Sequence, residues 1–392
     1  MIVLKYWRGY LVAGILAVIA GAAVAFAKAH PVLIDMVYPY LTRIYISAMA
    51  DWTAAVSVCL WQVLLLLGII ALIASIVMLI ILRWNFVQWL GWVTAVISCV
   101  ALLNTVVWGL GAYASPLADD VRLEVSDYTV SELVEATTYF RDQANELAKK
   151  MPRDNKGKTD IGTFEEIAEK SYDGFRYLTY EDNISAFASS KAPVKKLGMS
   201  GLFLGKGDSG MTVALTGESA VRSSVPSACL PFAMCKELSH RISIYSEADA
   251  QFAAFLACIH NESQAYQYSG YLMAYYYCYE SLASISTSAA QAAAKKADAG
   301  VGNYMRADLD ECIDFYGERV GAANVQAEAN ITDQGGEITL ISFSSYNSVT
   351  DLFASWYIRD FILPAYQEES NEFDPLDESQ VDLSGLVNAP AE

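Results

Sequence analysis

The chain of 392 residues is 54% hydrophobic and only 18% charged, and its mean hydropathy is +0.28. It is too apolar for a disordered chain. Its formal net charge of -18 argues against a nucleic-acid partner, because phosphate backbones are bound through Lys and Arg. The length is sufficient for a membrane module and one globular domain of moderate size.

The charge is divided unevenly along the chain. Residues 1–114 carry five basic and two acidic residues, whereas residues 115–392 carry 21 basic and 42 acidic residues. Seven of the eight Trp also precede residue 110. We therefore predict a membrane anchor over residues 1–114, an extracytoplasmic domain over 115–366 and an acidic, disordered tail over 367–392.

Three apolar runs are long enough to cross a bilayer, at residues 10–27, about 52–82 and about 86–112. A cleaved signal peptide is the alternative for the first run, because Ala25-Phe26-Ala27 resembles a cleavage site. That run is longer than the apolar part of most signal peptides, so we expect an anchor of three transmembrane helices. The mixed segment 32–49 predicts an interfacial helix on the outer surface.

The flanking charges predict the orientation. Lys5 and Arg8 precede the first run, and Arg83 lies between the second and the third. Positive residues favour the cytoplasmic side, so residues 115–392 should lie outside the cytoplasm. We expect a multi-pass protein of the cell membrane, with the lipid bilayer as one partner. The runs contain few polar side chains, notably Gln62 and Asn104, which favours an anchor over a transport path.

The remaining part of the chain predicts a mostly helical α+β domain. Two short strands around a Gly-rich turn are expected at 202–204 and 211–215, and Lys195-Lys196 should form a solvated corner. The five outer Cys are interpreted mainly as buried thiols, with no disulfide assigned. Helical spacing of apolar residues covers 130–150, 163–178, 230–244, 247–259, 265–283, 288–299, 303–319 and 347–366.

The segment with chemical information contains Lys236-Glu237-Leu238-Ser239-His240. In an intact H-E-x-x-H motif, two His one helical turn apart bind one zinc ion, and the Glu acts as general base. Here Lys236 stands where the first His would be, while Glu237 and His240 keep the other two positions. Glu247 opens the next apolar helix and is well placed for a third ligand. By itself this pattern is weak, because a surface helix often contains Lys, Glu and His by chance.

Outside the motif, the chain contains the segments PLADD, LGMSGLF, LTGE, LPF, SEADAQFAAFLAC and YQYSGYLMA. With these segments the sequence resembles a family of bacterial membrane-anchored, zincin-like proteins that is known only as a domain of unknown function, number 3810 in that series. The resemblance covers most of the chain, and it implies a zincin-like fold distantly similar to the gluzincin metallopeptidases, with a substrate cleft at a strand edge beside the motif helix. It carries metal-ligand roles onto His240 and Glu247 and the general-base role onto Glu237.

At Lys236 the sequence departs from the H-E-x-x-H motif, and this difference separates a pseudopeptidase from an active peptidase. An ammonium has no lone pair and cannot ligate zinc. We therefore expect a pseudopeptidase without a cofactor, in which Lys236 is a surrogate cation that pairs with Glu247 and Glu237. Such a protein would bind a peptide or an envelope protein at the former cleft.

Two alternatives stay open. An active zinc-dependent peptidase would hold its metal through His240, Glu247 and a further ligand such as Asp249. A structural envelope protein would bind no ligand at all. Glu218, which follows the expected strands, is a further candidate for the cleft, although a turn carboxylate is the simpler interpretation. His260 ends the helix that Glu247 opens, and we expect it at an exposed helix end.

Overall fold

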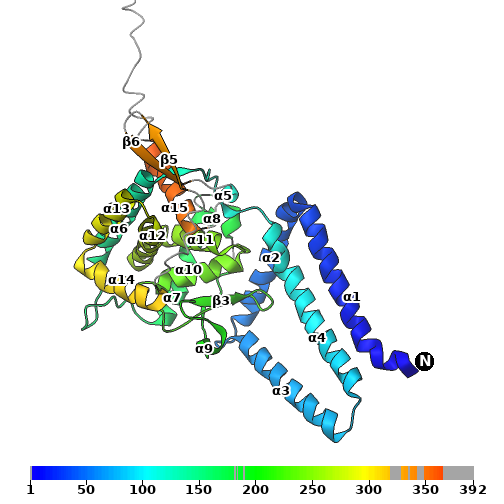
Figure 1. The fold of residues 1–392 in the computed structure, drawn as a ribbon. Helices are drawn as coiled ribbons and strands as arrows, with labels where there is room; N and C mark the ends of the chain where they lie inside the picture. The colour runs from blue at the N-terminus through cyan, green and yellow to red at the C-terminus, as the bar shows by residue number, and fades with distance from the viewer. Residues whose placement is uncertain are drawn as a thin grey trace, which may run out of the picture.

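The computed structural model describes residues 2–180, 182, 184–188, 190–317, 328–333, 336–341 and 348–364. Figure 1 shows an arm of long N-terminal helices beside a rounded domain that is built mostly of shorter helices. The four helices of the arm are α1 (Ile2–Ala29), α2 (Pro31–Thr53), α3 (Leu60–Ile81) and α4 (Phe86–Val107).

Three helices in the described part of the chain are long and apolar enough to cross a membrane. They are Tyr6–Ala29, Leu60–Ile81 and Phe86–Val107, which agrees with the number of spans that the sequence predicts. Two expected boundaries are wrong. The run expected from about residue 52 is divided, because α2 continues to Thr53 and α3 begins only at Leu60; the third span ends at Val107 and is followed by the short helix η1 (Gly109–Tyr113).

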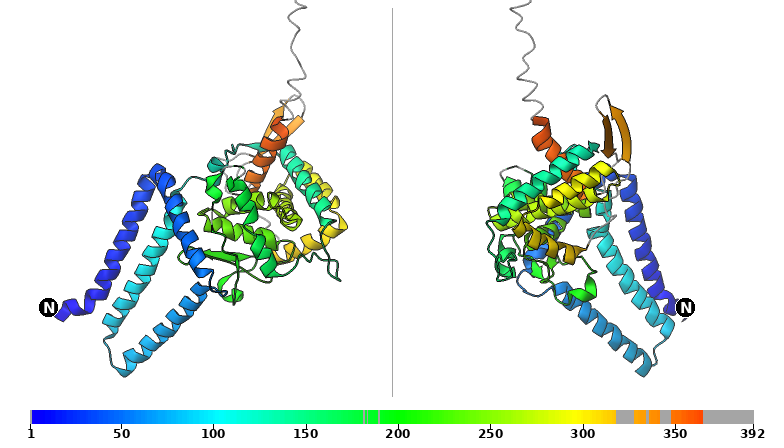
Figure 2. Two further views of the ribbon diagram at one scale, coloured as in Figure 1. Left: turned by 180° about the vertical axis from the view of Figure 1, so that it is seen from behind. Right: turned by 60° about the vertical axis from the view of Figure 1, so that its left-hand side comes forward.

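Helices α1 and α4 pack closely at a pair of glycines. A Cβ atom added to Gly9 would lie 2.2 Å from the carbonyl carbon of Gly91, so only a residue without a side chain allows this approach. Helix α3 packs differently. It contacts α4 near their shared turn, where Trp89 Nε1 donates to Ser75 Oγ at 3.2 Å, and beyond this contact the two helices diverge (Figures 1 and 2).

Helix α2 connects the arm to the domain. Its buried residues recur every three or four positions, which places them on one side of the helix. On this face, Thr42 Oγ1 lies 2.9 Å from Ser243 Oγ and 2.7 Å from Tyr245 OH, and Arg43 Nε donates to the carbonyl of Ile242. The segment expected as an interfacial helix is therefore helical, and one of its faces is packed against the domain.

The helices of the domain surround a single large core. Helices α10, α11 and α12 lie at its centre, and the rings of Phe140, Phe255, Phe353 and Trp356 pack edge to face or stack between α6, α11 and α15. The helices are α5 (Leu117–Asp120), α6 (Val130–Ala148), α7 (Phe164–Lys170), α8 (Asp173–Tyr180), η2 (Ser185–Phe187), α9 (Ser200–Phe203), α10 (Leu230–Arg241), α11 (Glu247–Ile259), α12 (Gln264–Ser284), α13 (Ser288–Ala299), α14 (Asn303–Tyr316), α15 (Val349–Tyr357) and the π-helical turn η3 (Ile358–Ile362).

Two small three-stranded sheets complete the described fold. One has the order β1–β6–β5, and the other has the order β2–β4–β3, with β4 antiparallel to β3 and parallel to β2. The strands are β1 (Tyr128–Thr129), β2 (Lys195–Lys196), β3 (Gly210–Val213), β4 (Glu218–Val221), β5 (Glu328–Asp333) and β6 (Gly336–Ile341).

The prediction of a strand at 202–204 is wrong, because residues 200–203 form helix α9. The hairpin consists instead of β3 and β4, paired from Gly210–Val221 to Val213–Glu218. Its turn uses Gly217 at a φ of +67°, a conformation that favours glycine. The apolar residues Phe203 and Leu204 pack against the small cluster that contains Trp61, which explains their hydrophobicity without a strand.

The cysteines divide into two kinds. A disulfide joins Cys229, at the start of α10, to Cys312 in α14. Cys235, Cys258 and Cys278 are buried thiols, as the sequence predicts. The tail expected at 367–392 lies outside the described residues.

Candidate functional site

The motif helix α10 and helix α11 are joined by a tight turn that places their ends side by side. After Arg241, Ser243 adopts a φ of +68° and reverses the chain. Ser246 then caps α11 by accepting a hydrogen bond from the backbone N–H of Asp249. Glu247 is consequently the first residue of α11 and faces the last two turns of α10.

Lys236 occupies the space between two carboxylates. Its Nζ lies 2.9 Å from Glu247 Oε1 and 3.3 Å from Glu237 Oε1. The Lys236 side chain is 12% exposed and that of Glu237 is 1% exposed. A nearly buried carboxylate is costly unless it is paired, and Lys236 supplies the required positive charge.

His240 completes this cluster. Its Nδ1 lies 2.8 Å from the carbonyl oxygen of Ile244, and its Nε2 lies 3.3 Å from Glu247 Oε2. Because both ring nitrogens face oxygen acceptors, the doubly protonated imidazolium is the form that satisfies both contacts. Burial alone would lower the pKa of His240, but the hydrogen bond with Glu247 and the charge of Glu237 outweigh burial and raise it.

The same balance acts on the other charges. Burial would lower the pKa of Lys236, yet the charges of Glu237 and Glu247 raise it above its ordinary value. Burial would raise the pKa of Glu247, yet the hydrogen bond from His240 and the charge of Lys236 hold it far below its ordinary value. The contacts thus pair two basic side chains with two carboxylates, and we call these residues the four-charge cluster: Lys236, Glu237, His240 and Glu247.

The residues of the four-charge cluster do not fit a zinc ion. The side chain that faces both carboxylates is an ammonium with three N–H donors and no lone pair. A divalent ion between the same carboxylates would be repelled by the ammonium of Lys236. Within the described residues, moreover, no group of three His, Cys, Asp or Glu side chains converges as metal ligands do.

Strand β3 passes directly beside the cluster. A Cβ atom added to Gly210 would lie 2.8 Å from Glu237 Cγ, so this glycine is what allows the strand to approach. Thr212 Oγ1 lies 3.0 Å from Glu237 Oε2 and 2.8 Å from the Glu237 carbonyl oxygen. In the described sheet β3 is an outer strand, and all four of its residues are partly exposed.

Sequence reasoning missed Gly210, Thr212 and Trp108 as neighbours of the cluster. The ring of Trp108, the residue that follows span α4, meets the ring of His240 edge to face at 5.8 Å. A glycine at the start of a strand signals a close approach, so Gly210 carried a detectable signal. No sequence pattern around Trp108 indicated a contact with His240.

Glu218 lies away from the four-charge cluster. As the first residue of β4 it is buried, and its carboxylate accepts hydrogen bonds from the backbone N–H groups of Leu60 and Trp61, at 2.6 and 2.9 Å. These are unpaired donors at the start of span α3, which a carboxylate stabilises. The prediction that Lys195 forms a solvated corner is wrong, since Lys195 is buried and pairs with Glu218 at 2.7 Å.

Two other candidates also lie away from the cluster. Asp249 is two residues beyond Glu247, about 200° around the helix, and it lines a separate cavity of about 780 Å³. His260 stacks on Tyr177 and lies 3.7 Å from Asp182 Oδ2. The structure thus brings together Lys236, Glu237, His240 and Glu247 and leaves Glu218, Asp249 and His260 elsewhere.

The fold and the site define a mostly helical protein with three candidate membrane spans and a partly buried cluster of opposite charges beside an edge strand. Residues 35–330 match a family described as "Protein of unknown function (DUF3810)", and the chain belongs to this family. Neither a comparison with curated proteins nor one with solved structures gave a match.

Proposed function

We propose that this protein is a membrane-anchored, zincin-like pseudopeptidase that binds an extended peptide or protein segment outside the cytoplasm and uses no zinc. The observation that carries the proposal is the position of Lys236, whose Nζ lies within 3.3 Å of both Glu237 and Glu247. In this proposal the cation stabilises two carboxylates that would otherwise repel each other, and so it keeps the former site folded without metal.

Strand β3 supports a peptide ligand. An extended segment binds an outer strand through backbone hydrogen bonds, and its side chains enter the neighbouring pockets. A segment added along β3 would run past Thr212 and the four-charge cluster. Glu247 is 53% exposed and lies at the open side of the cluster, where it would meet a basic or polar side chain of the ligand.

Two observations support the extracytoplasmic orientation. The disulfide between Cys229 and Cys312 belongs to an oxidising compartment, because the cytosol keeps most thiols reduced. Lys5, Arg8 and Arg83 also lie at the opposite ends of the spans from the domain. With this orientation the peptide-binding face is presented to envelope proteins.

The test is a metal analysis of the full-length protein purified in detergent, together with the variants Lys236→His and Glu237→Gln. We expect well under one zinc per chain in the native protein and about one per chain in Lys236→His, since that change restores the missing imidazole. Zinc at about one equivalent in the native protein would refute the proposal. Chelator-sensitive proteolysis that Glu237→Gln abolishes would establish the active peptidase instead.

Binding is tested separately, by selecting peptides from a random library on the full-length protein in lipid nanodiscs. Lys236→Met should weaken binding of the selected peptides about tenfold or more. Lys196→Met, which changes an exposed lysine in the sheet that contains β3, should not weaken it. If the protein selects no peptide, or if Lys236→Met leaves the affinity for the selected peptides unchanged, the protein would have a structural role without a ligand at this site.

A further inference from the structure

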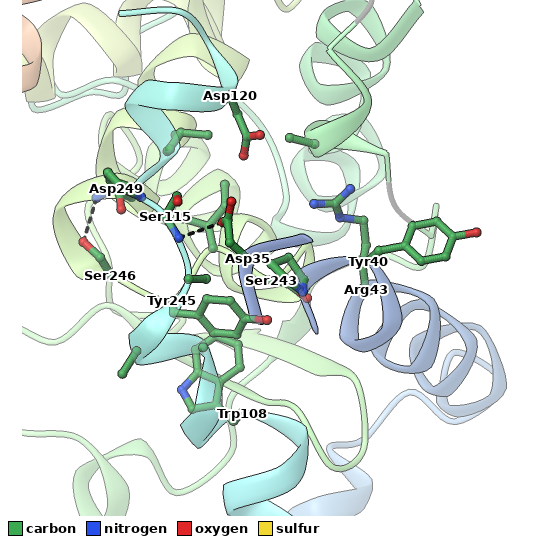
Figure 3. A pocket seen from close by; sticks show the side chains of 18 of the residues that line it. Asp35, Tyr40, Arg43, Trp108, Ser115, Asp120, Ser243, Tyr245, Ser246 and Asp249 are labelled. Atoms are coloured by element: carbon green, nitrogen blue, oxygen red, sulfur yellow. Dashed lines mark hydrogen bonds between the residues drawn. The ribbon is translucent and has the colours of Figure 1, made fainter. Parts of the chain in front are cut away.

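A second feature, distinct from the four-charge cluster, is the cavity of about 780 Å³ between α2, the segment after α4 and the turn between α10 and α11. Its volume is in the range of small-molecule sites. Figure 3 shows charged and aromatic side chains around it. Those that the argument uses are Asp35, Tyr40, Arg43, Trp108, Asp120 and Asp249.

With the candidate spans in a bilayer, the cavity would lie near the level of the lipid head groups. Trp108 immediately follows Val107, the last residue of span α4, and Asp35 is six residues beyond Ala29, the last residue of span Tyr6–Ala29. Since the helical rise is about 1.5 Å per residue, Asp35 lies on the order of 10 Å from the end of its candidate span. Each head-group layer is about 5–8 Å thick, so the mouth of the cavity opens beside this layer.

The cavity offers both signs of charge. Arg43 donates from Nε to the carbonyl of Ile242 and from Nη1 to that of Ser185, which leaves further N–H donors of its five on the cavity side. Asp35 and Asp120 are exposed at the mouth, and Asp249 is 5% exposed at the inner end. Asp35 accepts a hydrogen bond from Ser115 N through Oδ1, which fixes its position.

The walls between these charges are apolar and aromatic. Trp108 and Tyr245 pack edge to face at 4.9 Å, and both rings line the cavity. Tyr40 is exposed beside Arg43, where Figure 3 shows it at the margin of the site. Such a lining suits a small zwitterion whose acyl chains stay in the bilayer, since aromatic rings attract cations and tolerate the lipid interface.

We propose that this cavity binds the head group of a phospholipid that carries a phosphate and a primary ammonium, with the phosphate on Arg43 and the ammonium between Asp35 and Asp120. Arginine forms paired hydrogen bonds to phosphate oxygens, and a primary ammonium has three N–H donors for the carboxylates. A lipid with only a negative head group would bind more weakly, because three carboxylates in the cavity repel it and only the guanidinium of Arg43 attracts it. A quaternary ammonium has no N–H donor, so it would bind more weakly.

The experiment measures lipids bound to the full-length protein by native mass spectrometry, after incubation in detergent with phosphatidylethanolamine, phosphatidylcholine or phosphatidylglycerol. We expect phosphatidylethanolamine to bind at least about tenfold more tightly than either of the other lipids. The double variant Asp35→Asn/Asp120→Asn should remove this preference, because each Asn keeps the shape and an acceptor oxygen but not the charge. Asp119→Asn is the matched control, since Asp119 does not line the cavity.

Several results would overturn the proposal. Equal binding of phosphatidylglycerol and phosphatidylethanolamine would show that the carboxylates do not select the head group. Retention of the preference in Asp35→Asn/Asp120→Asn would place the lipid elsewhere. Free phosphoethanolamine is the second arm: if it binds in the cavity while phosphatidylethanolamine does not, the site serves a soluble zwitterion and the lipid assignment is wrong.

Discussion

The ammonium of Lys195 donates to the carboxylate of Glu218 at 2.7 Å, and this buried pair holds both sides of the break between α2 and α3. Lys195 also donates to the carbonyls of Thr53 and Val58, while Glu218 accepts from Leu60 and Trp61. Residues of the domain thus satisfy backbone groups at the end of one arm helix and at the start of the next.

Glu218→Ala should therefore destabilise the protein strongly. The change leaves the Lys195 charge buried without its partner and unpairs two N–H groups of α3, for a loss of about 3–5 kcal/mol. Thermal unfolding of the full-length protein in detergent measures this loss as a large fall in the midpoint temperature of unfolding. Glu165→Ala breaks the exposed pair with Lys196 and is the control, expected to change little. Equal midpoints for the two variants would contradict this account.

Lys236→Met should destabilise the protein for a related reason. It leaves Glu237, only 1% exposed, without the opposite charge, at a cost of about 3–5 kcal/mol. The double variant Lys236→Met/Glu237→Gln removes both charges, so its loss should be clearly smaller than the sum of the two single losses. Denaturant unfolding of the four proteins measures the coupling, and strictly additive losses would mean that the two side chains do not interact.

His240 should titrate above its ordinary pKa of 6.5, because Glu247 and Glu237 outweigh the effect of burial. Since the pKa is higher in the folded state, the stabilisation from protonated His240 is complete below about pH 6.5 and is lost as the pH rises through the folded pKa. The chain has three His, so side-chain NMR resolves the titration once His240→Gln has identified the resonance. Glu247→Gln should shift the midpoint down; an unchanged midpoint would exclude the pairing.

Glu247 gives the opposite dependence. Its pKa is held below the ordinary 4.5 by His240 and Lys236 despite burial. Its contribution to stability is therefore present above about pH 4.5 and is lost as the pH falls through the folded pKa. The acid limb of the stability curve should flatten in Glu247→Gln, measured by thermal unfolding between about pH 3 and 6; an identical acid limb would show that Glu247 is unpaired in solution.

Gly9→Leu should separate α1 from α4. A Cβ atom added at Gly9 would lie 2.2 Å from the backbone of Gly91, whereas a Cβ atom added at Gly14 would meet nothing within 4 Å. The substitution should cost about 1–3 kcal/mol or more, because backbone cannot give way as a side chain does. Gly14→Leu in the same span is the control. Thermal unfolding in detergent compares the two variants, and similar midpoints would contradict the close approach of α1 and α4 at Gly9 and Gly91.

Removal of the disulfide should also be costly. Cys229 and Cys312 are separated by 83 residues, and a cross-link over a loop of this length restricts the unfolded chain by about 4–5 kcal/mol. Cys229→Ser/Cys312→Ser should lower the unfolding midpoint, and reductant should lower that of the native protein to the same value. Reductant that further lowers the midpoint of the variant would indicate another disulfide.

Periodicity predicted most of the helices because their apolar faces are continuous, as in α11 and α12. Periodicity failed where contacts between residues far apart in sequence determine a helix boundary or a strand pairing. The break before Leu60 depends on Glu218, which is far away in sequence, and the identity of the strand pair depends on the turn at Gly217. The short strand β1 pairs with β6 across more than 200 residues, so no local signal revealed it.

The candidate site was partly predictable for the same reason. Lys236, Glu237 and His240 share one helix, so their spacing places them together. Glu247 required only a short turn, which Ser243 and Ser246 supply. Trp108 comes from another element, so its place beside His240 was outside the reach of a motif.

With the candidate span α4 in a bilayer, the edge-to-face contact between Trp108 and His240 would hold the four-charge cluster close to the membrane surface. Trp108 is the first residue beyond this candidate span, so the cluster would not extend far into the surrounding space. Under the proposed function, a partner of the cluster would therefore have to approach the lipid surface. An integral or lipid-tethered protein would meet that condition, whereas a freely diffusing protein would have to expose a protruding segment.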